Sequence, residues 1–95
     1  MTEMKPQIDK IRDLITENQL AEATCIIQDG LATRADDADL HFLLGQINVK
    51  QEKWGSAINQ FNRVLEIDPD YPAAQSRIEM ARSILGYFNP DLLNP

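Results

Sequence analysis

His41 and Cys25 are the residues of this 95-residue chain best suited to chemistry, and each is the only residue of its type. A thiolate beside an imidazole can act as a nucleophile with its general base. The surrounding pattern favours structural roles. Cys25 falls within an amphipathic segment, where a lone cysteine usually packs as a small buried hydrophobe. His41 is expected to pack half-buried on a helix face, so we predict no catalytic residue.

The acidic run "DDAD" at 36–39 is the other candidate for a site, in this case for a metal ion. It lacks the alternate-residue oxygen ligands and the glycine of a calcium loop. Aspartates in this position instead predict a cap for the helix that follows. The chain contains no glycine-rich phosphate loop and no zinc-ligand spacing. The sequence therefore predicts no metal site, no cofactor and no enzymatic activity.

The charge and composition narrow the class of protein. Hydrophobic residues make up 43% and charged residues 25% of the chain, and the net charge is −6. An acidic chain without a basic stripe is not expected to bind nucleic acid. No apolar run approaches the roughly 18 residues that a membrane span needs, and the charged N-terminal segment does not resemble a secretory signal. A single cysteine fits a reducing compartment, so we expect a cytoplasmic protein without membrane contact.

Helical periodicity governs the elements that must position these side chains. Apolar residues recur at steps of three and four, and no segment alternates as a strand would. Asp68 and Pro69 are expected to end one helix, and Pro72 to lie in the first turn of the next. Gly30 lies near the expected end of the second helix. The pattern predicts one all-α domain over 1–95, with helices over about 4–17, 20–32, 37–50, 54–67 and 71–87 and a tail over 88–95.

One stretch has a spacing with a physical reason. It runs His41-x2-Leu44-Gly45-x2-Asn48, then Ala57-x3-Phe61, then Pro69. The small Gly45 and Ala57 allow two helices to approach closely, Phe61 fills the space beside them, and the proline ends the pair. This stretch resembles the 34-residue tetratricopeptide repeat, W-x2-L-G-x2-Y, then A-x3-F, then P. His41 and Asn48 replace the two aromatic residues of that pattern.

The resemblance covers residues 4 to about 86, as a well-matched repeat (38–71), a degenerate repeat (4–37) and a C-terminal capping helix. It implies antiparallel helix pairs stacked as a short right-handed solenoid of about five helices. The register of the first helix has two alternatives. An offset by one full repeat period places Lys10 and Ile11 where Leu44 and Gly45 stand. A slide by one residue matches Ile8, Ile11 and Ile15 to the family's aromatic, leucine and aromatic positions.

The resemblance also implies a protein–protein interaction module whose groove holds a partner peptide or helix. In the unshifted register, the groove positions singled out as the partner-binding site are Lys5, Arg12, Asp39, Phe42, Gln46, Val49, Lys50, Arg77 and Met80. The shifted register places Pro6, Asp9, Lys10 and Asp13 in the groove instead. Four residues of the unshifted set, Lys5, Arg12, Lys50 and Arg77, favour an acidic or carboxylate-ended peptide, anchored by Phe42 and Val49.

Some relatives in this family clamp the C-terminal carboxylate of heat-shock chaperones. The corresponding positions here hold Ile8, Arg12, Leu43, Ala73 and Arg77. Only Arg77 fits, which argues against a chaperone tail as the ligand.

The C-terminal segment "GYFNPDLLNP" is unusually apolar for a tail. Tyr87, Phe88, Leu92 and Leu93 are its candidate contact residues. The segment either folds back on the chain's own helices or contacts a neighbouring copy, which would give a weak homodimer. A self-associating structural subunit is therefore the alternative to a peptide-binding module.

Overall fold

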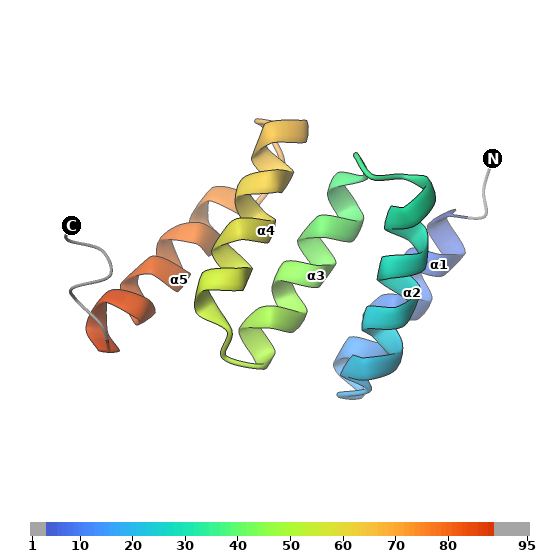
Figure 1. Ribbon diagram of the computed structural model, residues 1–95, viewed down its shortest axis with the longest axis horizontal. Coiled ribbons are helices and arrows are strands. Elements are labelled where there is room, and N and C mark those ends of the chain that lie inside the picture. The colour runs from blue at the N-terminus through green and yellow to red at the C-terminus, as the bar shows by residue number, and fades with distance from the viewer. Residues whose placement is uncertain (1–3, 89–95) are drawn as a thin grey trace.

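Five α-helices lie side by side in chain order (Figure 1). The computed structural model describes residues 4–88, with side chains described for 7–86. Within 4–88 all regular structure is helical and no strand occurs, which confirms the all-α prediction with five helices. The helices are α1 (Met4–Thr16), α2 (Leu20–Thr33), α3 (Ala38–Lys50), α4 (Trp54–Ile67) and α5 (Ala74–Phe88).

The first four helices begin and end within one residue of the expected ranges, but α5 begins later than predicted. The expectation that Pro72 lies in its first turn is wrong, because Pro72 and Ala73 form a turn. Ala73 has φ of 69°, a left-handed conformation that no helix can include. The Ala74 N–H donates to the carbonyl of Tyr71 across this turn at 3.4 Å. The helix therefore starts at Ala74.

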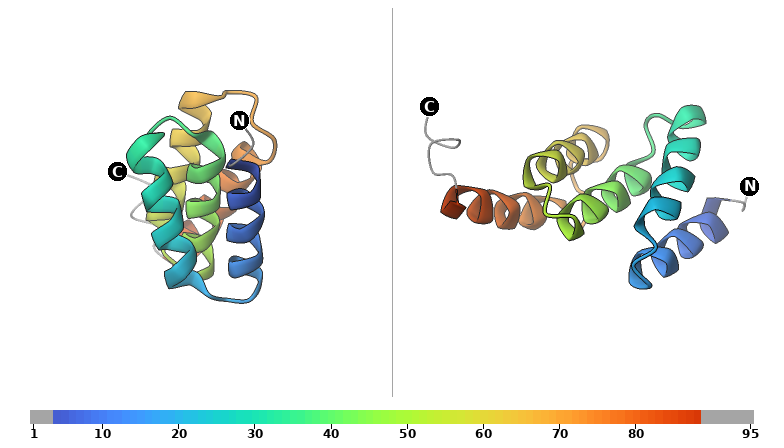
Figure 2. Two further views of the ribbon diagram at one scale, coloured as in Figure 1. Left: turned by 90° about the vertical axis from the view of Figure 1, so that its right-hand side faces the viewer. Right: turned by 60° about the horizontal axis from the view of Figure 1, so that its bottom comes forward.

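The helices form two layers. In the tilted view of Figure 2, α2 and α4 lie on one side of the molecule and α1, α3 and α5 on the other. Each helix packs against the next in the chain, α3 also contacts α1, and the closest association is between α3 and α4. The resulting body measures 44 × 28 × 21 Å. Surfaces made by α1, α3 and α5 thus face away from those made by α2 and α4.

The bounds of the first two helices recur in the next two. Met4 and Ala38 begin α1 and α3, and Leu20 and Trp54 begin α2 and α4, so both starts are separated by the period of the tetratricopeptide pattern. The ends of these helices are separated by the same interval. This is the offset of the unshifted alignment of the first helix. We refer to positions related by this offset as equivalent positions.

The turns inside the two pairs repeat the same geometry. Asn18 and Glu52, which are equivalent positions, have φ of 63° and 61°. The Asn18 N–H donates to the carbonyl of Ile15 at 3.0 Å, and the Glu52 N–H to that of Val49 at 2.9 Å. A left-handed residue two positions after the end of a helix lets the chain reverse while satisfying the last carbonyls. The two connections therefore have matching geometry.

The contact between α3 and α4 depends on Gly45, as its spacing predicted. A Cβ on Gly45 would lie 2.6 Å from Cε1 and 2.8 Å from Cζ of Phe61, and both Phe61 and Ala57 are fully buried. The positions equivalent to Gly45 and Phe61 in the first pair hold Ile11 and Ile27, each 0% exposed. One pair therefore combines glycine with phenylalanine, and the other combines two isoleucines, to fill corresponding places in the core.

The helix ends follow local chemistry. The Leu40 N–H donates to Oδ1 of Asp37 at 3.1 Å, which confirms the predicted aspartate cap of α3. Asp68, before Pro69, has φ −139° and ψ 93° and ends α4 as expected. Gly30 plays a different part from a cap: it lies inside α2 without positive φ, and a Cβ there would meet Cδ1 of Leu40 at 2.7 Å. Its small size gives room to the core side chain of α3.

Candidate functional site

A pocket opens on the face made by α1, α3 and α5. It has a volume of about 350 Å³. Five of the nine residues predicted for the groove line it together, namely Arg12, Gln46, Val49, Lys50 and Arg77. Ile15 and Thr16 complete the lining. We refer to these seven residues as the cationic pocket.

The charge of the cationic pocket contrasts with that of the chain. Three of its residues, Arg12, Lys50 and Arg77, are cations, and none carries a carboxylate. Among the residues whose side chains are described, the only ion pairs are those of Arg63 with Asp36 and Glu66. Within the described part of the chain, none of the three cations is paired with a carboxylate, in a protein whose net charge is −6. Ile15 and Val49 add an apolar surface between them.

Ile15 and Thr16 are pocket residues that were not predicted from the sequence. Their equivalent positions in the second pair are Val49 and Lys50, which were predicted, so the unshifted register carried the signal. Lys10, which the shifted register would place in the groove, is exposed but does not line the pocket. Leu43 and Ile8 are 2% and 8% exposed. Neither residue lines the pocket.

Phe42, predicted as an anchor for the ligand, is not among the residues that line the cationic pocket. Its ring packs against Phe61, with centroids 5.3 Å apart, and against Tyr71 at 5.0 Å. The guanidinium carbon of Arg77 lies 5.7 Å from the centroid of the same ring. A cation over an aromatic face is attracted to the ring electrons. Phe42 therefore contacts a pocket residue, Arg77, without lining the pocket itself.

Asp39 and Met80 also lie outside the pocket lining. Asp39 accepts a hydrogen bond from the phenol of Tyr71, which joins α3 to the turn before α5. Burial raises the pKa of Tyr71 well above its usual range, and the hydrogen bond to Asp39 raises it further. Met80 is 41% exposed on α5. The side chain of Lys5, the remaining predicted groove residue, falls outside the described residues.

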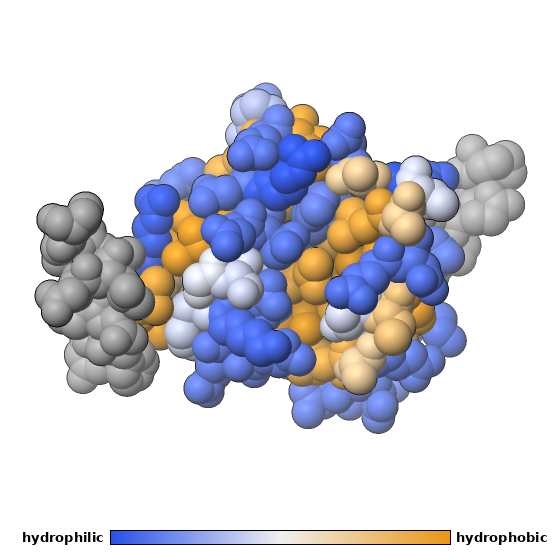
Figure 3. All heavy atoms as spheres, viewed as in Figure 1, coloured by the Kyte–Doolittle hydropathy of each residue, from blue (hydrophilic) through white to orange (hydrophobic). Residues whose placement is uncertain are grey.

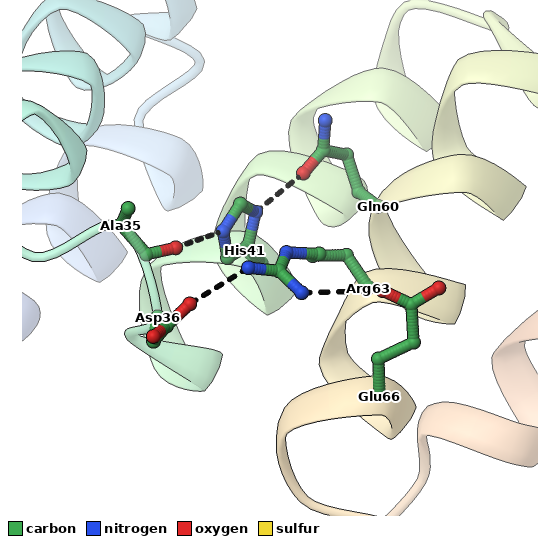
Figure 4. Close-up of polar contacts among 6 residues, drawn as sticks. All are labelled: Ala35, Asp36, His41, Gln60, Arg63 and Glu66. Carbon is green, nitrogen blue, oxygen red and sulfur yellow. Dashed lines mark hydrogen bonds and ion pairs between the residues drawn. The ribbon is translucent and has the colours of Figure 1, made fainter.

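His41 joins three segments of the chain (Figure 4). Its Nε2 lies 2.9 Å from the carbonyl oxygen of Ala35 and donates to it, because a carbonyl only accepts. Its Nδ1 lies 2.8 Å from Oε1 of the Gln60 side-chain amide on α4. Beside it, Arg63 of α4 pairs with Asp36 at 2.7 Å. The half-buried histidine thus ties the α2–α3 connection to α4.

Cys25 is exposed, so the prediction that it packs as a buried hydrophobe is wrong. It lies on the outer side of α2, whereas the fully buried side chains of that helix are Ala23 and Ile27. An amphipathic helix has apolar side chains at its margins as well as in its core stripe. The amino-acid pattern of α2 does not distinguish an apolar residue at the margin of the helix from one in its buried stripe.

A second hollow lies on the face opposite the cationic pocket. It is bordered by α2 and α4, and α3 forms its floor. Its volume is about 480 Å³. It is lined by Ala21, Thr24, Gln28, Leu44, Ile47, Asn48, Gln51, Lys53, Ser56 and Gln60. We call it the amide groove, because four of these residues carry side-chain amides. Of the ten residues that line the amide groove, Lys53 is the only charged one.

Neither a metal cluster nor a membrane-spanning helix is found among the described residues. No group of three or more His, Cys, Asp or Glu side chains in this part of the chain could hold a metal ion. None of the helices there has the length and apolar character needed to cross a bilayer. The predicted tail contacts at Leu92 and Leu93, and the side chains of Tyr87 and Phe88, lie outside the described residues.

No protein-family model matches this chain, and comparisons with curated proteins and with solved structures give no match either.

Proposed function

We propose that this chain is a non-enzymatic protein–protein interaction module that binds an acidic peptide segment of a partner protein in the cationic pocket. In this proposal the five helices form a short right-handed solenoid of antiparallel pairs, like that of tetratricopeptide proteins. The recurrence of helix bounds and turn hydrogen bonds at equivalent positions supports it. The observation that carries the ligand class is the gathering of Arg12, Lys50 and Arg77 around one pocket without a carboxylate.

The chemistry of the pocket suits a segment that combines carboxylates with an aliphatic side chain. Guanidinium groups pair with carboxylates through two parallel N–H donors, and the ammonium of Lys50 adds a point charge. Ile15 and Val49 provide the apolar contact. Binding of a short free peptide is expected at about micromolar Kd or weaker, because the pocket is small and the peptide loses conformational freedom.

The non-enzymatic part of the proposal draws on the two residues best suited to chemistry. Both ring nitrogens of His41 are engaged with Ala35 and Gln60, in positions that join elements of the fold. Cys25 is an exposed thiol. A free exposed thiol persists most readily where glutathione keeps cysteines reduced, so we place the protein in the cytoplasm.

A peptide titration tests the proposed ligand class. Fluorescein-labelled peptides Gly-Glu-Leu-Glu-Gly and Gly-Lys-Leu-Lys-Gly are titrated with the protein and followed by fluorescence anisotropy. We expect the acidic peptide to bind, with an affinity that falls as salt is added, and the basic peptide not to bind. Arg12→Glu with Lys50→Glu should abolish binding.

The matched control for this experiment is Lys10→Glu with Arg82→Glu. It makes the same change in net charge at two exposed positions outside the pocket. If both double variants lose binding equally, the net charge and not the pocket governs the interaction, and the proposal fails. If neither peptide binds and the mass of the protein by light scattering rises with concentration, the self-associating subunit is the better description.

A further inference from the structure

Asn48 is the one polar residue among the described side chains that is buried, at 9% exposed. It lies on α3 in the floor of the amide groove, on the face opposite the cationic pocket. Its backbone carbonyl accepts from the Lys53 N–H at 2.8 Å, as the α3–α4 turn requires. Its side-chain amide makes no hydrogen bond to any described residue.

The side-chain amide of Asn48 is exposed at the surface of the amide groove. Every fully enclosed side-chain nitrogen or oxygen in the described part of the chain has a hydrogen-bond partner. The amide of Asn48 has none within the described protein, so its small remaining exposed surface includes the amide. The surface that Asn48 lines is the amide groove. Asn48 is nine-tenths buried as a residue, and its amide, without a partner among the described residues, is therefore presented to whatever occupies that groove.

The rest of the lining shares this chemistry. Side-chain amides and hydroxyls rim the groove. Thr24 and Gln28 provide them on α2, Gln51 in the α3–α4 turn and Ser56 on α4. Gln60 is already engaged with His41. Leu44, which is half-buried, gives the groove apolar surface, whereas Ile47 is 1% exposed and adds almost none. In the space-filling view, apolar surface is seen in the hollow between α2 and α3, bordered by polar side chains (Figure 3).

We propose that the amide groove is a second binding site, which takes an extended, uncharged peptide segment through its main chain. A peptide group offers one donor and one acceptor, and a side-chain amide offers both in return. The groove carries no carboxylate or guanidinium group and its one charge is the ammonium of Lys53, so a segment with several charges would lose more water than this single group can replace. Leu44 and the exposed Ala21 would contact an apolar side chain of that segment.

The size of the groove sets the length of the segment. The lining residues of α2 run from Ala21 to Gln28, which is about 10 Å along a helix. An extended chain advances about 3.3 Å per residue, so about three residues fit. Such a site is small and would work together with contacts elsewhere on a partner. It does not depend on the cationic pocket, which faces the other way.

The test uses the blocked peptide acetyl-Ser-Gln-Leu-Gln-Ser-amide and the ¹⁵N-labelled full chain, followed by NMR at up to millimolar peptide. We expect shifts of the Asn48 side-chain amide and of backbone amides along Thr24 and Ser56, and none around Arg12 and Lys50. A peptide of the same sequence with N-methylated backbone amides should bind about tenfold more weakly, because it lacks the N–H donors.

Asn48→Leu separates a ligand role from a structural one. It keeps the number and branching of the side-chain heavy atoms and replaces the amide, which borders the groove, by methyl groups, so the thermal midpoint should stay or rise while peptide affinity falls about tenfold. Asn59→Leu makes the same change at an exposed position of α4 outside the groove and should leave affinity unaltered.

Three outcomes would overturn the proposal. The first is the absence of shifts in the groove at millimolar peptide. The second is equal binding of the N-methylated peptide, and the third is wild-type affinity in Asn48→Leu. Equal binding of Ser-Asp-Leu-Asp-Ser in the groove would contradict the preference for uncharged segments.

Discussion

Replacing Gly45 by alanine tests the packing on which the α3–α4 contact depends. The added Cβ would lie 2.6, 2.8 and 2.9 Å from three atoms of the Phe61 ring. Carbon atoms pack favourably at about 3.5 Å or more, so the ring would have to retreat by about 1 Å. Phe61 is 0% exposed and its ring already packs against Phe42. It has no open space into which to move.

Two effects of opposite sign set the magnitude. Overpacking a core typically costs about 1–3 kcal/mol, and a rigid, fully buried ring places Gly45→Ala near the upper end. Alanine favours the helix by about 1 kcal/mol relative to glycine. We expect a net loss of about 2 kcal/mol in the free energy of unfolding. For a domain of this size this corresponds to a fall of roughly 8–16 °C in Tm.

Two other helical glycines, Gly55 and Gly30, are matched controls, measured by urea denaturation with circular dichroism. A Cβ on Gly55 would meet nothing within 4 Å, so Gly55→Ala should stabilise by up to about 1 kcal/mol. Gly30→Ala should lie close to zero, because the atom that its Cβ would meet is the flexible end of Leu40. If Gly45→Ala is as stable as Gly55→Ala, close approach does not explain the glycine. Combining it with Phe61→Leu should cost less than the two single changes added together.

Three further changes test the local chemistry of the fold. Asp37→Ala should lower the free energy of unfolding by about 1 kcal/mol through loss of the helix cap, and Asp37→Asn by a few tenths only; the denaturant midpoint measures both. The stability of the wild type should decline as pH rises above about 10, because the unfolded chain then releases the Tyr71 proton that the folded chain retains. Tyr71→Phe should remove that part of the decline between about pH 9 and pH 11, and an unchanged slope would contradict the raised pKa. Ala73→Gly should stabilise by up to about 1 kcal/mol by relieving the left-handed strain, whereas Ala74→Gly, inside α5, should destabilise by a similar amount; calorimetry that ranks them the other way would refute this account.

The elements that could be predicted from the sequence are those set by local rules. The Gly45, Ala57 and Phe61 spacing describes a single contact between neighbouring helices, and the structure contains that contact. Asp37 and Pro69 act through their own backbone neighbours, so their effects on α3 and α4 were predictable. The start of α5 was not predictable. Ala73 adopts a left-handed conformation in the folded chain, and alanine does not favour that conformation by itself.

The candidate site was predictable only in part, for a related reason. A shared helix face placed Arg12, Gln46 and Lys50 on one surface, and the structure brings them around one pocket. Phe42 lies on that face too, but Phe61 and Tyr71 are close enough to hold its ring. The exposure of Cys25 depends on the rotation of α2 against its neighbours. Such facts arise from packing between elements, which periodicity within one element does not specify.

The two fillings of corresponding core positions, Ile11 with Ile27 and Gly45 with Phe61, bear on how such a chain can change over generations. No single substitution converts one of these residue pairs into the other. Glycine combined with isoleucine would leave a cavity that lowers the free energy of unfolding by about 2–5 kcal/mol. Isoleucine combined with phenylalanine would overpack the core.

A lineage that starts from two identical helix pairs must therefore pass through a destabilised ancestor, or acquire stability elsewhere beforehand, before the pairs can diverge. Once diverged, the pairs are no longer interchangeable residue by residue, although their helices still begin and end at equivalent positions. Divergence of this kind would make a repeat hard to detect in the amino-acid sequence, although the helices and turns of the backbone would still repeat.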